Sequence, residues 1–179
     1  MKFPFPLFKL PKFPTTTYKQ CFEHLWDSNT SLRVSNNKPE HVAAVLAVFL
    51  ERAQHAVRVY STNYTAAVFE DDVFLSALRQ ALVRPALSIE MIFSIMPPPN
   101  SQLAQLADEI HPARFTLWEG HALPKIASFA VADRHAYRFA DSPTSSAACP
   151  KDEKTSRVLI DGFERLKIVG GSPPKPLVF

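Results

Sequence analysis

Side chains that could act as nucleophiles, acids or bases, or bind anions, gather within one short stretch of the sequence. His121 and Lys125 come just before a predicted strand, and Asp133, Arg134 and His135 lie in the turn that follows it. An imidazole can act as a nucleophile or transfer a proton, and an ammonium or guanidinium group can bind the oxygens of an anion. Two interpretations follow: the stretch holds catalytic or phosphate-binding residues, or it is a solvated loop and turn.

A second group of polar side chains ends another predicted strand. The run AVRVYSTNY places Tyr60, Ser61, Thr62, Asn63 and Tyr64 at its carboxyl end. Open α/β sheets bind ligands at the carboxyl ends of their strands. This run is therefore a candidate binding surface, with an ordinary polar loop as the alternative.

The remaining carboxylates and motifs give no sign of a metal or a cofactor. Glu70, Asp71 and Asp72 cluster at a predicted helix start, where the helix dipole already favours negative charge, and Glu90 faces away from the apolar side of its strand. Four glycines leave no room for a glycine-rich phosphate loop, and neither G-x-S-x-G nor HExxH occurs. We expect no bound metal and no cofactor.

Composition and charge favour a soluble α/β domain in the cytoplasm. Of 179 residues, 46% are apolar and 21% charged, and the longest apolar stretch, Val42–Leu50, is too short to span a membrane. Prolines interrupt the first residues, which argues against a secretory signal, and Cys21 and Cys149 are best interpreted as reduced thiols, with a disulfide as the alternative.

Basic charge is concentrated at the start of the chain. Without the lysines at positions 2, 9, 12 and 19, 16 of the 20 basic residues remain against 17 acidic ones. The body is thus close to neutral and lacks the broad basic face of a dedicated duplex-DNA binder.

The chain divides into an arm, one domain and a tail. Residues 1–20 contain four Pro and four Phe, which predicts an extended arm whose Phe side chains dock on this subunit, a second copy or another protein. Residues 21–171 form a single domain, and 172–179 a Pro-rich tail.

Hydrophobic spacing predicts helices that alternate with strands through the domain. We expect helices over 18–26, 39–55, 69–83, 101–111 and 151–169; strands over 31–34, 56–64, 87–93 and 113–120; a hairpin over 126–141; and a Ser/Thr/Ala-rich loop over 142–149. This order predicts an α/β fold with a mixed, largely parallel sheet and helices on both faces.

The order of elements resembles one half of the phospholipase D superfamily. That family carries the signature H-x-K-x-x-x-x-D, in which His is the nucleophile, Lys binds phosphate and Asp supports the site. Placing Asp133 on the signature Asp puts Ser128 at the Lys position and Ile126 at the His position. Isoleucine cannot attack phosphorus and serine carries no fixed charge, so the resemblance implies a phospholipase-D-like domain without the family's chemistry.

The resemblance also implies partners. Single-copy members pair as dimers, so we expect a homodimer, with the Phe-rich arm crossing to the second subunit. The expected role is a catalytically silent binding or scaffolding module for nucleic acid, a phosphate-bearing ligand or another protein. The expected binding residues are Tyr60, Ser61, Asn63, Ser128, Asp133 and Arg134.

Two alternatives stay open. In the first, the protein is an active phosphodiesterase or nuclease that uses His121 or His135 with Lys125. The intervals from His121 to Lys125 and from Lys125 to Asp133 are four and eight residues, longer than those of the signature, and a strand advances about 3.3 Å per residue. In the second, the protein is an adaptor whose likeness to the family is coincidental.

Overall fold

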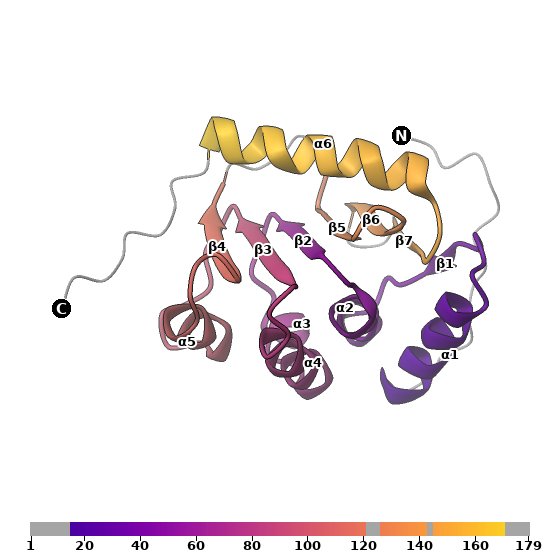
Figure 1. Ribbon diagram of the computed structural model, residues 1–179, viewed down its shortest axis with the longest axis horizontal. Helices are drawn as coiled ribbons and strands as arrows, with labels where there is room; N and C mark the ends of the chain where they lie inside the picture. The colour runs from indigo at the N-terminus through magenta and orange to yellow at the C-terminus, as the bar shows by residue number, and fades with distance from the viewer. Residues whose placement is uncertain (1–14, 121–125, 143–144, 171–179) are drawn as a thin grey trace.

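The computed structural model describes residues 15–120, 126–142 and 145–170, which form a seven-stranded sheet with helices on both faces (Figure 1). The helices are α1 (Thr15–Asp27), α2 (Pro39–Arg52), α3 (Ala66–Phe69), α4 (Asp72–Leu82), α5 (Gln102–Glu109) and α6 (Glu153–Gly170). The strands are β1 (Val34–Ser35), β2 (Ala56–Ser61), β3 (Ser88–Phe93), β4 (Phe115–Glu119), β5 (Ser128–Ala132), β6 (Ala136–Ser142) and β7 (Ser145–Cys149). No helix within the described ranges has the length and apolarity needed to cross a membrane.

The sheet is mixed, in the order β1-β7-β6-β5-β2-β3-β4. Strands β2, β3 and β4 run parallel, because helices connect them, whereas β2–β5, β5–β6, β6–β7 and β1–β7 are antiparallel. The α/β class and the mixed sheet are confirmed. The expectation of a largely parallel sheet is corrected, since most of the pairings are antiparallel.

Strand β7 explains much of that difference. The sequence predicts a loop over 142–149, but Ser145–Cys149 pairs with both β6 and β1. The segment SSAAC lacks the β-branched and aromatic residues that mark strands. Its small side chains nevertheless suit a strand that is nearly buried along its length, so pairing within the sheet outweighs local preference.

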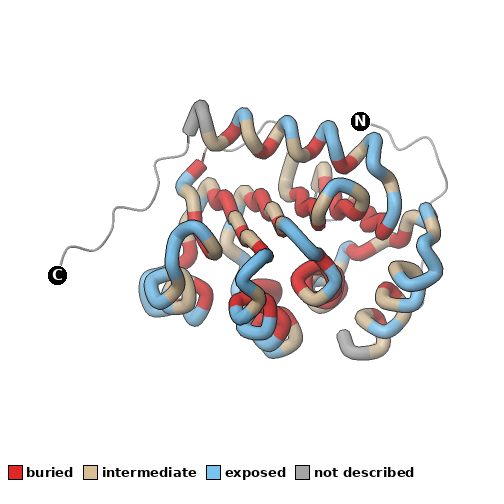
Figure 2. Tube along the Cα trace, viewed as in Figure 1, coloured by how far each residue is buried: buried red, intermediate tan, exposed pale blue. Residues whose placement is uncertain are grey.

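Two cores lie on opposite sides of the sheet. Helices α2–α5 pack on one face and α6 alone lies along the other, with the inward side of each helix buried (Figures 1 and 2). The larger core, on the α2 face, includes Phe22, Phe49, Val59, Phe74, Leu78, Met91, Phe93 and Phe115. The smaller core, under α6, consists of Tyr60, Ile92, Phe129, Val131, Tyr137, Phe139, Cys149, Leu159, Phe163 and Leu166.

Two predicted boundaries move. Helix α1 begins at Thr15, so the last six residues of the expected extended arm 1–20 are helical. The Phe-rich residues 1–14 and the tail 172–179 lie outside the described residues. The predicted helix 69–83 is α4, which begins later, at Asp72, because Asp71 caps it by accepting hydrogen bonds from the backbone N–H groups of Val73 and Phe74; Phe69 instead ends the short helix α3. Cys21 and Cys149 carry free thiols.

Candidate functional site

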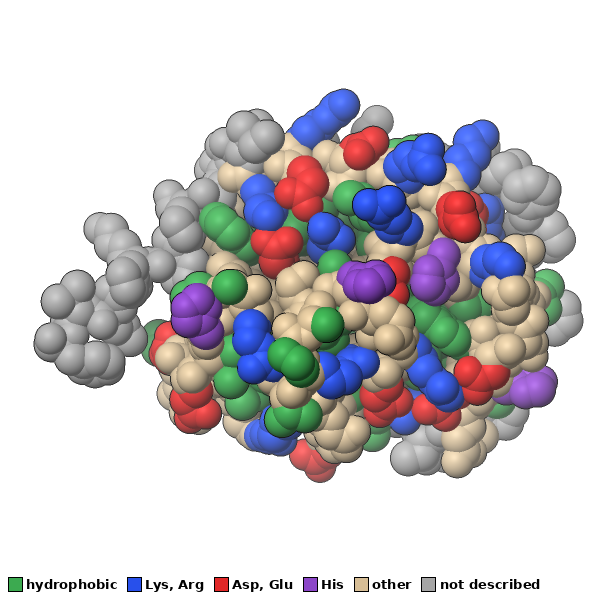
Figure 3. All heavy atoms as spheres, viewed as in Figure 1, with side chains coloured by type: hydrophobic (Ala, Val, Ile, Leu, Met, Phe, Trp, Pro, Cys, Tyr) green, Lys and Arg blue, Asp and Glu red, His purple; other side chains and the backbone are tan. Residues whose placement is uncertain are grey.

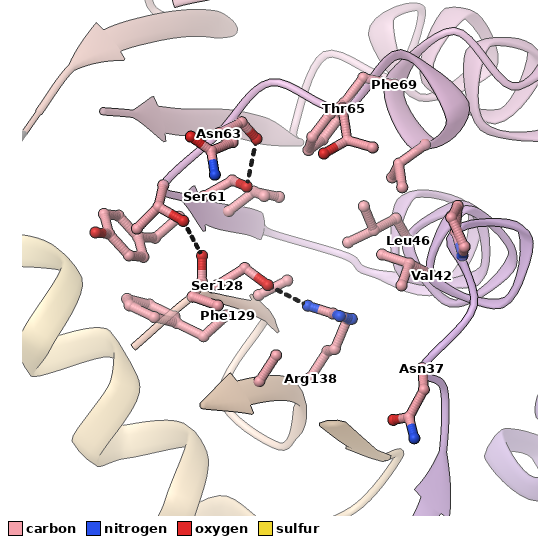
Figure 4. A pocket seen from close by; sticks show the side chains of 18 of the residues that line it. Asn37, Val42, Leu46, Ser61, Asn63, Thr65, Phe69, Ser128, Phe129 and Arg138 are labelled. Atoms are coloured by element: carbon pink, nitrogen blue, oxygen red, sulfur yellow. Dashed lines mark hydrogen bonds between the residues drawn. The ribbon is translucent and has the colours of Figure 1, made fainter. Parts of the chain in front are cut away.

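A pocket of about 210 Å³ opens where β2 ends and β5 begins (Figure 4). Ser61 and Ser128 are directly opposite each other in the antiparallel β2–β5 pair, at the end of the sheet where both strands meet the pocket. The walls come from α2, α3, the loop after β2, and strands β5 and β6. The lining residues include Asn37, Val42, Leu46, Val59, Ser61, Thr62, Asn63, Thr65, Val68, Phe69, Ser128 and Arg138.

The pocket contains a buried positive charge. Arg138 lies on β6 opposite Ala130 of β5, and its side chain is on the α2 face of the sheet. Only 6% of the residue is exposed, and its Nη1 donates a 2.6 Å hydrogen bond to the Ser128 hydroxyl (Figure 4). Burial lowers the pKa of Arg138 to about 10, although Tyr18 nearby acts in the opposite direction. Arg138 therefore remains charged at neutral pH.

Arg138 has no carboxylate partner among the described residues. No Asp or Glu lines the pocket, and the Nε atom is buried without a hydrogen-bond partner in the described structure. Arg33 by contrast pairs with Asp152 at 2.8 Å, and Arg84 donates to three backbone carbonyls at the end of α2. A buried cation balanced only by a neutral hydroxyl is costly, which makes Arg138 unusual in this chain.

Hydroxyl groups fix the rim of the pocket. Ser61 Oγ donates to the Asn63 carbonyl at 2.8 Å, and Thr62 Oγ1 donates to the Ala127 carbonyl at 2.8 Å. These bonds hold the loop after β2 against the start of β5. The Tyr60 ring turns the other way and packs on Phe129 in the smaller core, with 5.3 Å between ring centroids.

The structure thus brings three of the predicted binding side chains, Ser61, Asn63 and Ser128, to one pocket and adds Arg138 to them, whereas the predicted Tyr60 lines the pocket but directs its ring into the smaller core. Sequence reasoning missed Arg138. A signal was present: in the strand AYRFAD it occupies the same face as Ala136 and Ala140, so the alternation of the strand places it inward.

Asp133, Arg134 and His135 lie at the opposite end of β5 from Ser128. Five strand residues separate the two ends, about 16 Å at 3.3 Å per residue. The structure therefore does not bring the turn and the pocket together. The His135 ring packs edge-on against Trp26, with 5.2 Å between ring centroids, and Arg134 is exposed.

Asp133 has a structural role in that turn. Its carboxylate accepts hydrogen bonds from the backbone N–H groups of Gln54, His55 and Ala56 at 2.8–3.0 Å. Its backbone is left-handed, with φ 51°, a conformation that Asp and Asn adopt more readily than most residues. Asp133 thereby ties the β5–β6 turn to the start of β2.

The signature His position does not contribute to the pocket. Ile126 packs against the smaller core, under α6, and is not among the residues that line the pocket. At the signature Lys position, Ser128 faces the pocket and receives the hydrogen bond from Arg138. His121 and Lys125 lie outside the described residues.

Glu70, Asp71 and Glu90, three of the four acidic residues considered above, make structural contacts. Glu70 accepts hydrogen bonds from the Tyr64 hydroxyl and the Gln102 backbone, and Glu90 pairs with Lys167 at 2.6 Å. Within the described part of the chain, no three metal-binding side chains are grouped closely enough to hold an ion.

The chain is similar to known proteins in structure and not in sequence. No model of a protein family and no curated protein matches the sequence. Nuc from Salmonella typhimurium, a phospholipase D family member, is similar in structure, with 12% identity and a TM-score of 0.50 over 73% of this chain and 88% of Nuc. NucT from Helicobacter pylori has 10% identity and a TM-score of 0.53 over 75% of this chain and 92% of NucT.

A third similar structure is TrmBL2, described as an archaeal chromatin protein with a novel mode of DNA binding. It has 13% identity and a TM-score of 0.59 over 87% of this chain, and the match spans 62% of TrmBL2. At these identities the likeness is one of fold. Together with the seven-stranded mixed sheet, it shows that this chain has the α/β fold of phospholipase D family members.

Proposed function

We propose that the protein is a non-catalytic binding module with a phospholipase-D-like fold. Its pocket, where β2 ends and β5 begins, binds a phosphate-bearing ligand. The observation that carries the proposal is the state of the signature positions. Ile126 faces the core under α6, Ser128 replaces the phosphate-binding ammonium, and Asp133 is engaged by backbone N–H groups far from the pocket. The residues described around the pocket include no imidazole that could form a phosphohistidine.

Binding remains chemically reasonable without the signature, because Arg138 supplies a positive charge from a different strand. Its Nη1 reaches Ser128, the residue at the signature Lys position. Guanidinium groups bind oxyanions well through paired N–H donors. The described lining of the pocket therefore retains a cation beside the lost ammonium position and includes no imidazole.

Nucleic acid is one ligand of this chemistry. The archaeal chromatin protein of similar fold binds DNA, as its description says, which supports testing DNA here. Basic and acidic side chains are interspersed over the face drawn in Figure 3, and the chain carries only a small net charge of +3. Single strands with an accessible end suit a small pocket better than a duplex that requires a broad basic surface.

The experiment for catalysis uses the purified full chain. We expect no turnover of bis-p-nitrophenyl phosphate, single-stranded DNA, duplex DNA or RNA, with or without EDTA. Turnover that His121→Ala or His135→Ala abolishes would overturn the proposal and establish the alternative, a phosphodiesterase that uses rearranged residues with Lys125.

The experiment for binding uses fluorescence anisotropy of labelled single-stranded DNA, duplex DNA and RNA at fixed salt. We expect single strands to bind more tightly than duplex, with an affinity that falls as salt rises. Absence of binding to every nucleic acid would leave a small phosphate-bearing ligand as the occupant.

A further inference from the structure

The buried charge of Arg138 also indicates the net charge of the group that the pocket can bind. We propose that the pocket binds a small ligand with one singly charged anionic group beside an apolar body, the anionic group lying against Arg138 and Ser128. This inference rests on the proposed binding function and names the ligand class of the same pocket.

The single charge follows from the charges around the site. Arg138 is the one cationic side chain among the described lining residues, and none of those residues is acidic. Beside a buried guanidinium a monoanion neutralises the charge, whereas a dianion leaves one negative charge without a partner in the pocket. A carboxylate and a phosphodiester share the required chemistry, since each spreads one negative charge over two oxygens.

Hydrogen-bond donors are available for such a group. Only one hydrogen bond of Arg138 is described, from Nη1 to Ser128, and the Nε–H is buried without a partner in the described structure. The Ser128 hydroxyl accepts from Arg138, which leaves its own proton free to be donated. An oxyanion beside both groups would receive charge-assisted hydrogen bonds.

We infer an apolar part of the ligand from the pocket wall across from Arg138. Val42 and Leu46 of α2 and Phe69 of α3 lie across the pocket from Arg138 (Figure 4), and Val59 and Val68 add to its apolar lining. The volume of about 210 Å³ lies below the roughly 300–1,000 Å³ usual for drug-sized ligands, so the occupant or the inserted end group is small. Ser61 and Asn63 form the polar rim of the pocket, past which the rest of a longer ligand would extend into solvent.

The test compares matched probes by titration calorimetry and thermal unfolding on the full chain. Benzoate and dimethyl phosphate supply one negative charge on a carboxylate and on a phosphodiester, and benzamide is the neutral counterpart of benzoate. We expect at least one of the anions to bind and raise the melting temperature at millimolar concentration, and benzamide to do neither. Binding of dimethyl phosphate identifies a phosphodiester as the source of the charge, whereas binding of benzoate alone identifies a carboxylate and overturns the phosphate ligand of the proposed function.

Variants locate the site. Arg138→Met should weaken anion binding about tenfold to a hundredfold, the effect of losing one charge-assisted hydrogen bond. Arg157→Met removes the same charge from an exposed position on α6 and should leave binding unchanged. The benzoate and benzamide comparison on the wild-type protein decides the matter even if Arg138→Met fails to fold.

Three outcomes would overturn the inference: equal binding of benzamide and benzoate, anion binding that survives Arg138→Met, or no binding of either anion. If single-stranded DNA binds the wild type and Arg138→Met equally, the protein still binds nucleic acid, but through a surface other than this pocket, and the ligand site proposed here fails. If the protein hydrolyses DNA, the proposed function itself fails.

Discussion

Arg138 holds a positive charge in the interior at a cost to the folded state. Burial lowers the pKa of Arg138 to about 10, so the folded protein binds this proton less tightly than the unfolded chain does. Below pH 10 the charge is present in both states, so the full penalty applies at neutral pH. As the pH rises above 10 the folded state releases the proton first, and the penalty declines.

Replacing Arg138 with an apolar residue of similar volume should therefore stabilise the protein when no anion is bound. We expect Arg138→Met to raise the free energy of unfolding at pH 7 by about 1–3 kcal/mol, as removal of buried charge has done elsewhere. Urea unfolding measures the change. A loss of stability would show instead that Arg138 serves the fold rather than a ligand.

Asp133 should show the opposite behaviour. Asp133→Ala removes three hydrogen bonds and places a less suitable residue at φ 51°, which together should lower the free energy of unfolding by about 2–4 kcal/mol. Asp133→Asn keeps an acceptor and a residue that tolerates this backbone, so its loss should be smaller. Equal stability of Asp133→Ala and the wild type in urea would refute the structural role.

These two residues show what sequence can and cannot reveal about a site. The turn at Asp133 is predictable because Asp favours turns, but its bonds to residues 54–56 depend on the pairing of β2 with β5. Ser61 and Ser128 were each selected from sequence for separate reasons. Their position beside Arg138 depends on the register of β2, β5 and β6, which cannot be predicted from hydrophobic spacing within each strand.

Among the elements, α6 is held at its first turn by Asp152. The carboxylate accepts hydrogen bonds from the Thr155 N–H at 3.0 Å and hydroxyl at 2.8 Å, and it pairs with Arg33 at 2.8 Å. Burial alone would raise the pKa of Asp152, but the bonds to Thr155 and Arg33 outweigh it and lower the pKa. A lowered carboxyl pKa contributes stability above pH 4 that is lost as the pH falls through the folded value.

We expect Asp152→Ala to lower the free energy of unfolding by about 1–2 kcal/mol at pH 7, the range seen for lost helix caps. Asp152→Asn keeps the cap and loses the charge, so it should cost less. Unfolding measured from pH 7 down to pH 2 should show the difference between wild type and Asp152→Asn disappearing at the acid end. A difference that stays constant with pH would exclude a role for the charge.

Most helices and strands were predictable, because their apolar residues follow helical or alternating spacing. Helix α2 begins at the predicted Pro39, and the hairpin of β5 and β6 turns at the predicted Asp133–Arg134–His135. Strand β7 was not predictable, because SSAAC has neither alternation nor β-branched residues. Because the prediction omits β7, it also omits the antiparallel pairs of β7 with β1 and β6.

At the scale of the whole molecule, the prediction concerns the number of chains that assemble. The resemblance to single-copy phospholipase D members leads us to propose a homodimer. Light scattering coupled to gel filtration should then give twice the mass of one chain, unchanged on moderate dilution. A monomer mass throughout would mean that the pocket of one chain is complete by itself.

The pairing of β1 with β7 has a consequence for how the protein is made. Val34 and Ser35 bond to Ala148 and Ala147, so an early strand finds its neighbour only near the end of synthesis. At typical translation speeds the nascent strand waits on the order of ten seconds before that partner emerges from the ribosome. The edge of the sheet next to α1 is therefore completed last, and a chain stalled before β7 would expose an unpaired β6 edge to other nascent chains.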